Sequence, residues 1–138
     1  MVCVTQAISV KAPAEAVISL LSDVHQLPDW APSFARRVLP EGGQWVAEAH
    51  DGTRTPVTVR ASREHGTVDV LVTQAPPRGA YMRVLGNGDG SELILSVMFP
   101  GAGGTVAIAR QGQIVEQELR AVRDLAERGT QAPGPEGT

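Results

Sequence analysis

The sequence has few of the residues that mark the most easily recognised classes of protein. Cys3 is the only cysteine, so the chain can form no internal disulfide and no thiolate metal cluster of its own. Basic residues form no run and the formal net charge is −3 at pH 7, so the electrostatic footprint of a nucleic-acid-binding protein is missing. No apolar run approaches the roughly 18–20 residues that span a bilayer, and the first ten residues lack the features of a signal peptide. We therefore expect a cytoplasmic protein with no membrane span and no nucleic-acid partner.

Aromatic residues are also scarce, at 4% of the 138 residues, so an internal pocket should have mostly aliphatic walls. The remaining composition is that of an ordinary globular protein, with 42% hydrophobic and 20% charged residues. A chain of this length suits one domain with one core. We expect a single domain over residues 1–128 and a flexible tail over residues 129–138.

The first thirty residues predict one strand and two short helices. Apolar residues alternate with polar ones at the start, as a half-buried strand requires, at Val2, Val4, Ile8 and Val10. Pro13 suits the first turn of a helix over about 13–21, because its missing N–H would have no partner there. Ser22 and Asp23 resemble a cap that opens a second short helix, which Pro28 and Trp30 limit.

From Phe34 to Phe99, short runs of β-forming residues alternate with turn residues. The candidate strands cover about 34–39, 44–50, 54–60, 67–73, 79–86 and 91–99. GNGDG has strand-like residues on both sides, so a hairpin turn with positive φ at Asn87, Gly88 and Gly90 fits better than a phosphate-binding or calcium-binding loop. The regular spacing predicts an antiparallel meander.

The last segment changes to a helical pattern. Apolar residues recur at three- and four-residue intervals, at Ile108, Val115, Leu119, Val122 and Leu125. We expect a long helix over about 105–128, although its first part, TVAIAR, also reads as a strand. Gly129 fits a C-terminal stop, and GTQAPGPEGT a loose tail.

The order of these elements predicts an α+β fold. A strand, two short helices, six strands and a long helix form a seven-stranded antiparallel sheet with the helices on one face. Such a sheet, curled around a long C-terminal helix, leaves a space that is either filled by side chains or kept open for a ligand.

The chain resembles the START-like superfamily, also called the SRPBCC or birch-pollen-allergen-like group, which includes polyketide cyclases, dehydratases and lipid carriers. The resemblance lies in VTQAISVKAPAEAVISLLSDVHQLPDWAPSF, GTVDVLV, RVLGNGDGSEL and the final amphipathic helix, and it covers residues 2–128. It implies a helix-grip fold that holds a small hydrophobic ligand. It leaves the chemistry open, because members of this superfamily differ in function.

No motif for a metal or a cofactor is present, and we expect neither. His25, His50 and His65 lie in separate loops or strand ends, without the paired spacing of a zinc site. Each is most simply a surface histidine. His50, next to Asp51, is kept as a candidate for proton transfer, because imidazole titrates near neutral pH.

Asp69 and Arg83 are the most informative polar residues of the predicted sheet. If residue 73 pairs with residue 79, Asp69 lies opposite Arg83 and Leu71 lies opposite Tyr81. A hairpin folded about Gly88 then adds Leu93, Leu95, Val97 and Phe99 to the same face. The other face carries Val68, Val70, Val72, Met82, Val84, Ile94 and Met98.

Either of these two faces can form the inside of the sheet. In the first interpretation, the Asp69 face lines the cavity, and the valine face is an apolar exterior or a homodimer contact. In the second, the valine face is the core and Asp69–Arg83 is an exposed ion pair worth about 1 kcal/mol or less. We favour the first, because the leucines predicted on the Asp69 face are too apolar to face water.

In the helix-grip layout that the resemblance implies, Trp30 lies where the two short helices meet the open end of the sheet. An indole there either closes the core or contacts a bound molecule. Phe34 and Trp45 are core candidates that could line the same space. The residues predicted to contact a ligand are Trp30, Phe34, Trp45, Asp69, Leu71, Tyr81, Arg83, Leu93, Leu95, Val97, Val115 and Leu119.

Three functions are compatible with these features. The leading hypothesis is a module that binds a small, largely hydrophobic molecule of polyketide, lipid or aromatic type. The alternative is a cofactor-free aromatase/cyclase or dehydratase, in which Arg83 polarises a carbonyl, Asp69 holds Arg83 or acts as base, and Tyr81 or His50 moves protons. The third is a protein-interaction module that uses the valine face.

Overall fold

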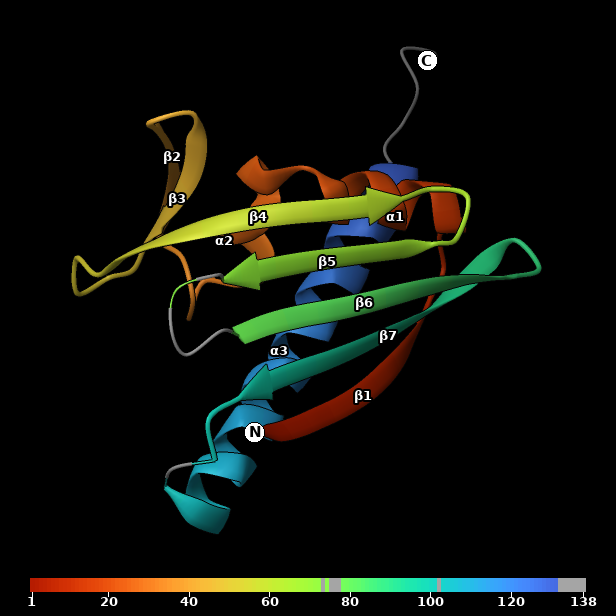
Figure 1. Cartoon of the computed structure of the whole chain (residues 1–138). Helices are drawn as coiled ribbons and strands as arrows, with labels where there is room; N and C mark the ends of the chain where they lie inside the picture. Colours follow the sequence, from red (N-terminus) through yellow and green to blue (C-terminus); the bar gives the residue numbers. More distant parts are fainter. Residues whose placement is uncertain (73, 75–77, 102, 132–138) are drawn as a thin grey trace.

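A computed structural model of the chain describes residues 1–72, 74, 78–101 and 103–131. The expected α+β layout with a seven-stranded sheet is confirmed (Figure 1). The elements are β1 (Val2–Val10), α1 (Ala14–Ser22), the 3-10 helix η1 (Val24–Gln26), α2 (Leu27–Trp30), β2 (Arg37–Glu41), β3 (Gln44–Glu48), β4 (Arg54–Ser62), β5 (Thr67–Val72), β6 (Arg78–Asn87), β7 (Gly90–Phe99) and α3 (Gly104–Gln131).

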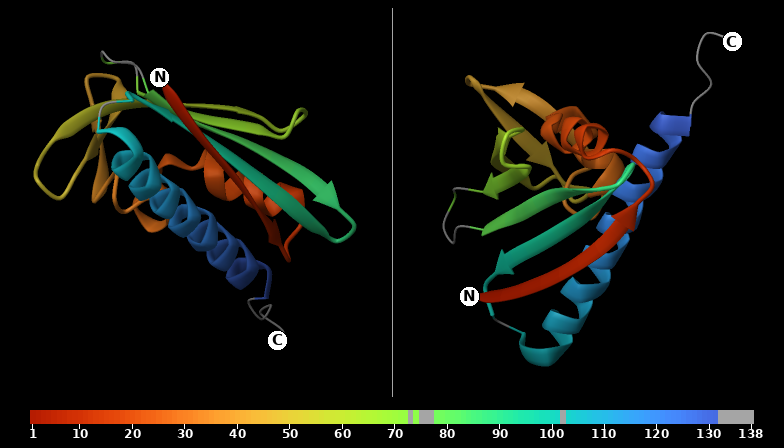
Figure 2. Two further views of the ribbon diagram at one scale, coloured as in Figure 1. Left: turned by 90° about the horizontal axis from the view of Figure 1, so that it is seen from below. Right: turned by 90° about the vertical axis from the view of Figure 1, so that its right-hand side faces the viewer.

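The sheet is an antiparallel meander with one strand added from the other end of the chain. Its strand order is β1-β7-β6-β5-β4-β3-β2, so the first strand pairs with the last. The helices gather on one face, and α3 runs across it beside α1 (Figure 2). Helix α3 contacts β1, α1, α2 and β7. This is the expected helix-grip arrangement.

The short helices differ in detail from the prediction. Pro13 is the N-cap of α1, just outside the helix, with extended backbone angles. The Asp23 side chain accepts a hydrogen bond from the backbone N–H of His25 and so caps η1. Pro28 lies inside the first turn of α2 and starts that helix instead of limiting it, because a helix needs no N–H donor at this position. Trp30 ends α2, as expected.

Helix α3 is longer than predicted. TVAIAR is helical, so the strand alternative for this segment is wrong. The helix also continues through Gly129 to Gln131, because a single glycine costs only about 1 kcal/mol within a helix. The predicted flexible tail therefore begins inside the helix, and its residues 132–138 lie outside the described residues. None of the described helices combines the length and the apolar character needed to cross a bilayer.

The β6–β7 hairpin turns through two residues, Gly88 and Asp89, between paired Asn87 and Gly90. Only Gly88 has positive φ (63°), as in a type II′ turn, so the expectation of positive φ at Asn87 and Gly90 is wrong. Gly90 serves a different purpose, because a Cβ there would lie 2.8 Å from the carbonyl oxygen of Val10.

This turn sets which side chains of β7 face inward. Arg83 pairs with Ile94 and Val84 pairs with Leu93, one residue away from the register that we predicted. A shift of one residue moves every side chain of a strand to the other face. Leu93 and Leu95 therefore join the valine face, and Ile94 joins Arg83.

The β5–β6 register also differs, by two residues. Asp69 pairs with Tyr81, and Arg83 pairs with Thr67, so the predicted Asp69–Arg83 and Leu71–Tyr81 pairs are wrong. An even shift leaves the faces unchanged. Asp69, Leu71, Tyr81 and Arg83 thus share one face, as expected.

The valine face is the core, so the second interpretation of the two faces is correct. Its members on β5, β6 and β7 are almost fully buried: Val68, Val70, Val72, Met82, Val84, Leu93 and Leu95. Val115, Leu119 and Val122 of α3 belong to the same buried cluster. The Asp69 face looks away from the helices, with Arg83 exposed.

Because one face of the sheet is buried and the other is exposed, substitution by alanine should reduce the free energy of unfolding by different amounts on the two faces. Leu93→Ala should destabilise the protein by about 2–5 kcal/mol, because the side chain is fully buried. Arg83→Ala should change the free energy of unfolding by no more than about 0.5 kcal/mol. Urea denaturation measures both values, and equal costs would contradict the assignment.

Candidate functional site

A cavity of about 240 Å³ lies between one end of the sheet, α2 and the N-terminal half of α3. Val72 and Arg78 line it where β5 ends and β6 begins, and Val97 lines it from β7. Leu27 and Trp30 contribute from α2. Ligand pockets usually measure about 300–1,000 Å³, so this one suits a small molecule.

The walls of the cavity are unusually aromatic for this chain. Trp30, Phe34 and Phe99 all line it, whereas the whole sequence has two tryptophans, two phenylalanines and one tyrosine. Trp30 is only 2% exposed, and its Nε1 is shielded from solvent with no hydrogen-bond partner among the described residues. A molecule in the cavity would therefore contact the carbon atoms of the indole and not its N–H group.

One carboxyl group interrupts this apolar lining. Glu118 comes from α3, between the core residues Val115 and Val122, and is 9% exposed. Within the described part of the chain it has no hydrogen bond and no ion pair. Burial alone raises the pKa of Glu118 to about 7, because removal from water penalises the charged form.

The other polar groups of the cavity come from three elements. Arg78 begins β6, lines the cavity and is exposed. Gln111 lies two helical turns before Glu118 on α3, and Ser33 follows α2. Among the described residues, Arg78 and Glu118 are the only charged side chains in the lining.

The structure brings only part of the predicted ligand-binding set to this cavity. Trp30, Phe34 and Val97 line it. Leu93, Leu95, Val115 and Leu119 are buried in the adjoining core but do not line it. Trp45 lies in a separate open depression against the His25 ring, with a distance of 4.9 Å between ring centroids.

The predicted polar site lies on the opposite side of the sheet. Asp69 accepts hydrogen bonds on Oδ2 from Nε and Nη2 of Arg60, at 3.0 and 2.8 Å. Leu71, Tyr81 and Arg83 share this outer face and are absent from the cavity lining. The prediction that these residues surround a ligand between sheet and helix is therefore wrong, and its physical cause is the one-residue error in the β6–β7 turn.

Glu118, Gln111 and Arg78 were missed, although the sequence carries a signal for the first two. Positions 111, 115, 118 and 122 fall on one face of a helix, and Val115 and Val122 belong to its apolar stripe. A glutamate within such a stripe is a buried carboxyl group. For Arg78 the sequence offers no comparable signal, because it follows a proline-rich loop.

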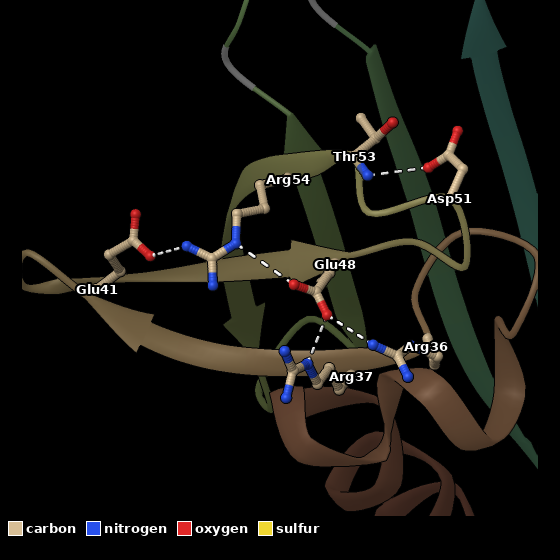
Figure 3. A network of polar contacts seen from close by, with 7 residues as sticks. All are labelled: Arg36, Arg37, Glu41, Glu48, Asp51, Thr53 and Arg54. Atoms are coloured by element: carbon tan, nitrogen blue, oxygen red, sulfur yellow. Dashed lines mark hydrogen bonds and ion pairs between the residues drawn. The ribbon is translucent and has the colours of Figure 1, made fainter.

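A second charged cluster ties the β2–β3 hairpin to its surroundings (Figure 3). Glu48 is 7% exposed and accepts hydrogen bonds from Arg37 Nε at 2.6 Å and Arg36 Nη2 at 2.9 Å. Arg54 bridges Glu48, at 3.4 Å, and Glu41, at 2.6 Å. Hydrogen bonds from Arg37 and Arg36 lower the pKa of Glu48 to about 2, so this cluster supports the fold above about pH 4.5 and weakens toward pH 2.

His50 lies in the exposed turn that follows this cluster, away from the cavity. Its neighbour Asp51 accepts a hydrogen bond from the backbone N–H of Thr53 at 2.9 Å (Figure 3). This bond lowers the pKa of Asp51. The carboxylate is thus engaged in shaping the turn.

Comparison with known proteins identifies the family. The family described as "Polyketide cyclase / dehydrase and lipid transport" matches residues 1–127, and the chain belongs to it. A search of curated proteins gave no match.

Solved structures with the same fold include a START superfamily protein from Mycobacterium smegmatis. It has a TM-score of 0.72 and 19% identity, over 91% of this chain and 97% of that one. The Zhui aromatase/cyclase from Streptomyces sp. R1128 has a TM-score of 0.66 and 21% identity, over 96% and 98%. The di-domain ARO/CYC protein BexL has a TM-score of 0.73 and 19% identity, over 96% of this chain and 48% of that one. Likeness at this level shows the fold.

The raised pKa of Glu118 predicts a pH-dependent stability. The folded protein binds more protons than the unfolded chain between pH 4.5 and 7, so stability should fall as the pH rises through this window, by about 3 kcal/mol. Glu118→Gln should not show this loss. Its free energy of unfolding relative to that of the wild type should therefore increase from pH 4.5 to pH 8. Urea denaturation at both values tests this. Glu116→Gln, an exposed change on the same helix, should follow the wild type, and a pH-independent Glu118→Gln difference would contradict the assignment.

Proposed function

We propose that the protein binds a small, largely apolar molecule in the cavity between the sheet and α3. One observation supports this most directly: an apolar, aromatic space of about 240 Å³ contains a carboxyl group with no described partner. Because Glu118 belongs to the lining and has no described hydrogen-bond partner, its carboxyl group can form a hydrogen bond with a molecule in the cavity. The family includes lipid-transport and cyclase proteins, and a ligand-holding cavity agrees with both.

A second candidate function is a cofactor-free cyclase or dehydratase. The observation in its favour is the position of Glu118, a buried carboxyl group with a pKa of about 7. A group that titrates near the working pH can both donate and accept a proton, as general acid–base catalysis requires. Glu118 replaces Arg83, Asp69 and Tyr81 as the proposed catalytic residue, because those three lie outside the cavity.

The remaining sequence predictions concern partners and location. The protein-interaction hypothesis relied on the valine face, which is the core and cannot serve as a contact surface. A cytoplasmic location, the lack of a nucleic-acid partner and a homodimer stay predictions. If a homodimer forms, it must use another surface, such as the outer face of the sheet.

Filling the cavity should abolish binding. Ala80 lines the cavity, so Ala80→Phe should remove saturable binding of 2-naphthol and of medium-chain acyl compounds. Ala7→Phe makes the same change on the exposed outer side of β1 and should leave binding unchanged. Isothermal titration measures binding, and urea denaturation confirms that each variant is folded. Absence of saturable binding by the wild type, with no small molecule retained through native purification, would refute the proposed function.

The catalytic alternative makes a separate prediction. If the protein cyclises or dehydrates a poly-β-ketone, Glu118→Gln should lower kcat by about 10²-fold or more while substrate still binds. The wild-type rate should depend on a group with a pKa near 7. Arg83→Ala should leave turnover unchanged. A slow Arg83→Ala variant beside an active Glu118→Gln variant would reverse the assignment of the two residues.

A further inference from the structure

The chemistry of the cavity walls selects among apolar ligands, and the following inference rests on the proposed function. Three of the five aromatic residues of the chain, Trp30, Phe34 and Phe99, surround the same space. Glu118 reaches this space from α3, 9% exposed and with no described hydrogen-bond or ion-pair partner. The cavity therefore combines aromatic ring surface with one unpaired carboxyl group.

We propose that the ligand is a small organic cation, an ammonium group attached to an apolar body. Aromatic faces attract a cation through the negative side of the ring quadrupole, and the attraction increases when water is excluded. A buried carboxylate without a partner is unfavourable, and an ammonium group supplies both the opposite charge and hydrogen-bond donors. The apolar body of the ligand would contact the aliphatic part of the lining.

Other ligand charges fit the walls less well. An anionic ligand would place a second negative charge beside Glu118, in a space where charges are poorly screened. Arg78 is the one other charged group in the described lining, and its side chain is exposed. The described contacts include no ion pair between Arg78 and Glu118, and water screens the charge of the exposed guanidinium. A neutral ligand can donate a hydrogen bond to Glu118 but brings no opposite charge to its ionised form.

Pairing of an ammonium group with Glu118 also fixes the direction in which ligand affinity changes with pH. Burial raises the pKa of Glu118 to about 7, and an ammonium group binds its ionised form. Arg78 from β6 is the only other titratable or charged side chain in the described lining, with none from α2, β5 or β7. Arginine does not titrate in this range, so Glu118 is the group of the described lining whose charge changes between pH 5.5 and 8.5.

Three probes with the same phenyl group test the inference. These are 2-phenylethylamine, neutral 2-phenylethanol and anionic 3-phenylpropionate, titrated calorimetrically at pH 5.5 and 8.5. The amine stays protonated at both values, as lysine does. Its affinity should rise about 30-fold with pH, because the ionised fraction of a carboxyl group with a pKa of about 7 rises by that factor. The alcohol should bind more weakly at pH 8.5 and show no such rise.

Matched variants assign the effect to its groups. Glu118→Gln should remove both the preference for the amine and its pH dependence, while the alcohol still binds. Glu116→Gln removes an equal charge from the exposed face of the same helix and should change neither. Phe34→Leu keeps an apolar wall but loses the ring, and should weaken amine binding by about twofold to fivefold with little effect on the alcohol.

The possible outcomes separate this inference from the proposed function. Equal binding of amine and alcohol at both pH values, or amine affinity that falls as the pH rises, would overturn the inference and leave the proposed function intact. Preference for 3-phenylpropionate would do the same and would indicate Arg78 as the anchoring group. Failure of all three probes to bind would overturn the inference, and the cavity-filling experiment above would then decide the proposed function separately.

Discussion

The structure depends on covering the inner face of the sheet with α1 and α3. Buried valines and leucines occupy alternate positions on β5, β6 and β7. Because alternate residues of a strand point to the same face, all of these side chains lie on the inner face of the sheet. Two helices share this face: α1 packs on β4 to β7, and α3 packs on β1 and β7. The cavity lies at the end of this contact, where α2 completes the wall with Trp30.

Glu118 is where the requirements of folding and of binding oppose each other. A leucine at this position would extend the stripe of α3 and fill part of the cavity, which would favour stability. The carboxyl group instead keeps a polar point inside an aromatic space, and the fold tolerates it by raising its pKa. A polar residue on the buried stripe of a helix departs from the usual apolar pattern. Departures of this kind that bring no structural benefit are characteristic of functional sites.

Most of the fold could be predicted from the sequence, whereas most of the site could not. The alternation of Val2 to Val10 and the stripe from Val115 to Val122 depend on local periodicity, which a single sequence displays. The face of β7 depended on whether two or three residues form the turn at Gly88, and that count is not visible in GNGDG. An error of one residue there moved Leu93 to the wrong side and placed the candidate site around Arg83 on the outer face. Glu118 follows the same periodicity, between Val115 and Val122, but it is absent from the predicted site residues.

The pairing of the first strand with the last affects how the chain can fold during its synthesis. β1 has β7 as its sheet neighbour, with Val2 opposite Phe99, and α3 follows β7 in the chain. At about 5–20 residues per second, a ribosome needs several seconds to make β7 after β1 has been completed. During that interval the growing chain carries an amphipathic strand with neither of its edges occupied, which is a template for unwanted association. Ribosome-bound chains of this fold therefore have their greatest need of a chaperone before β7 has been translated.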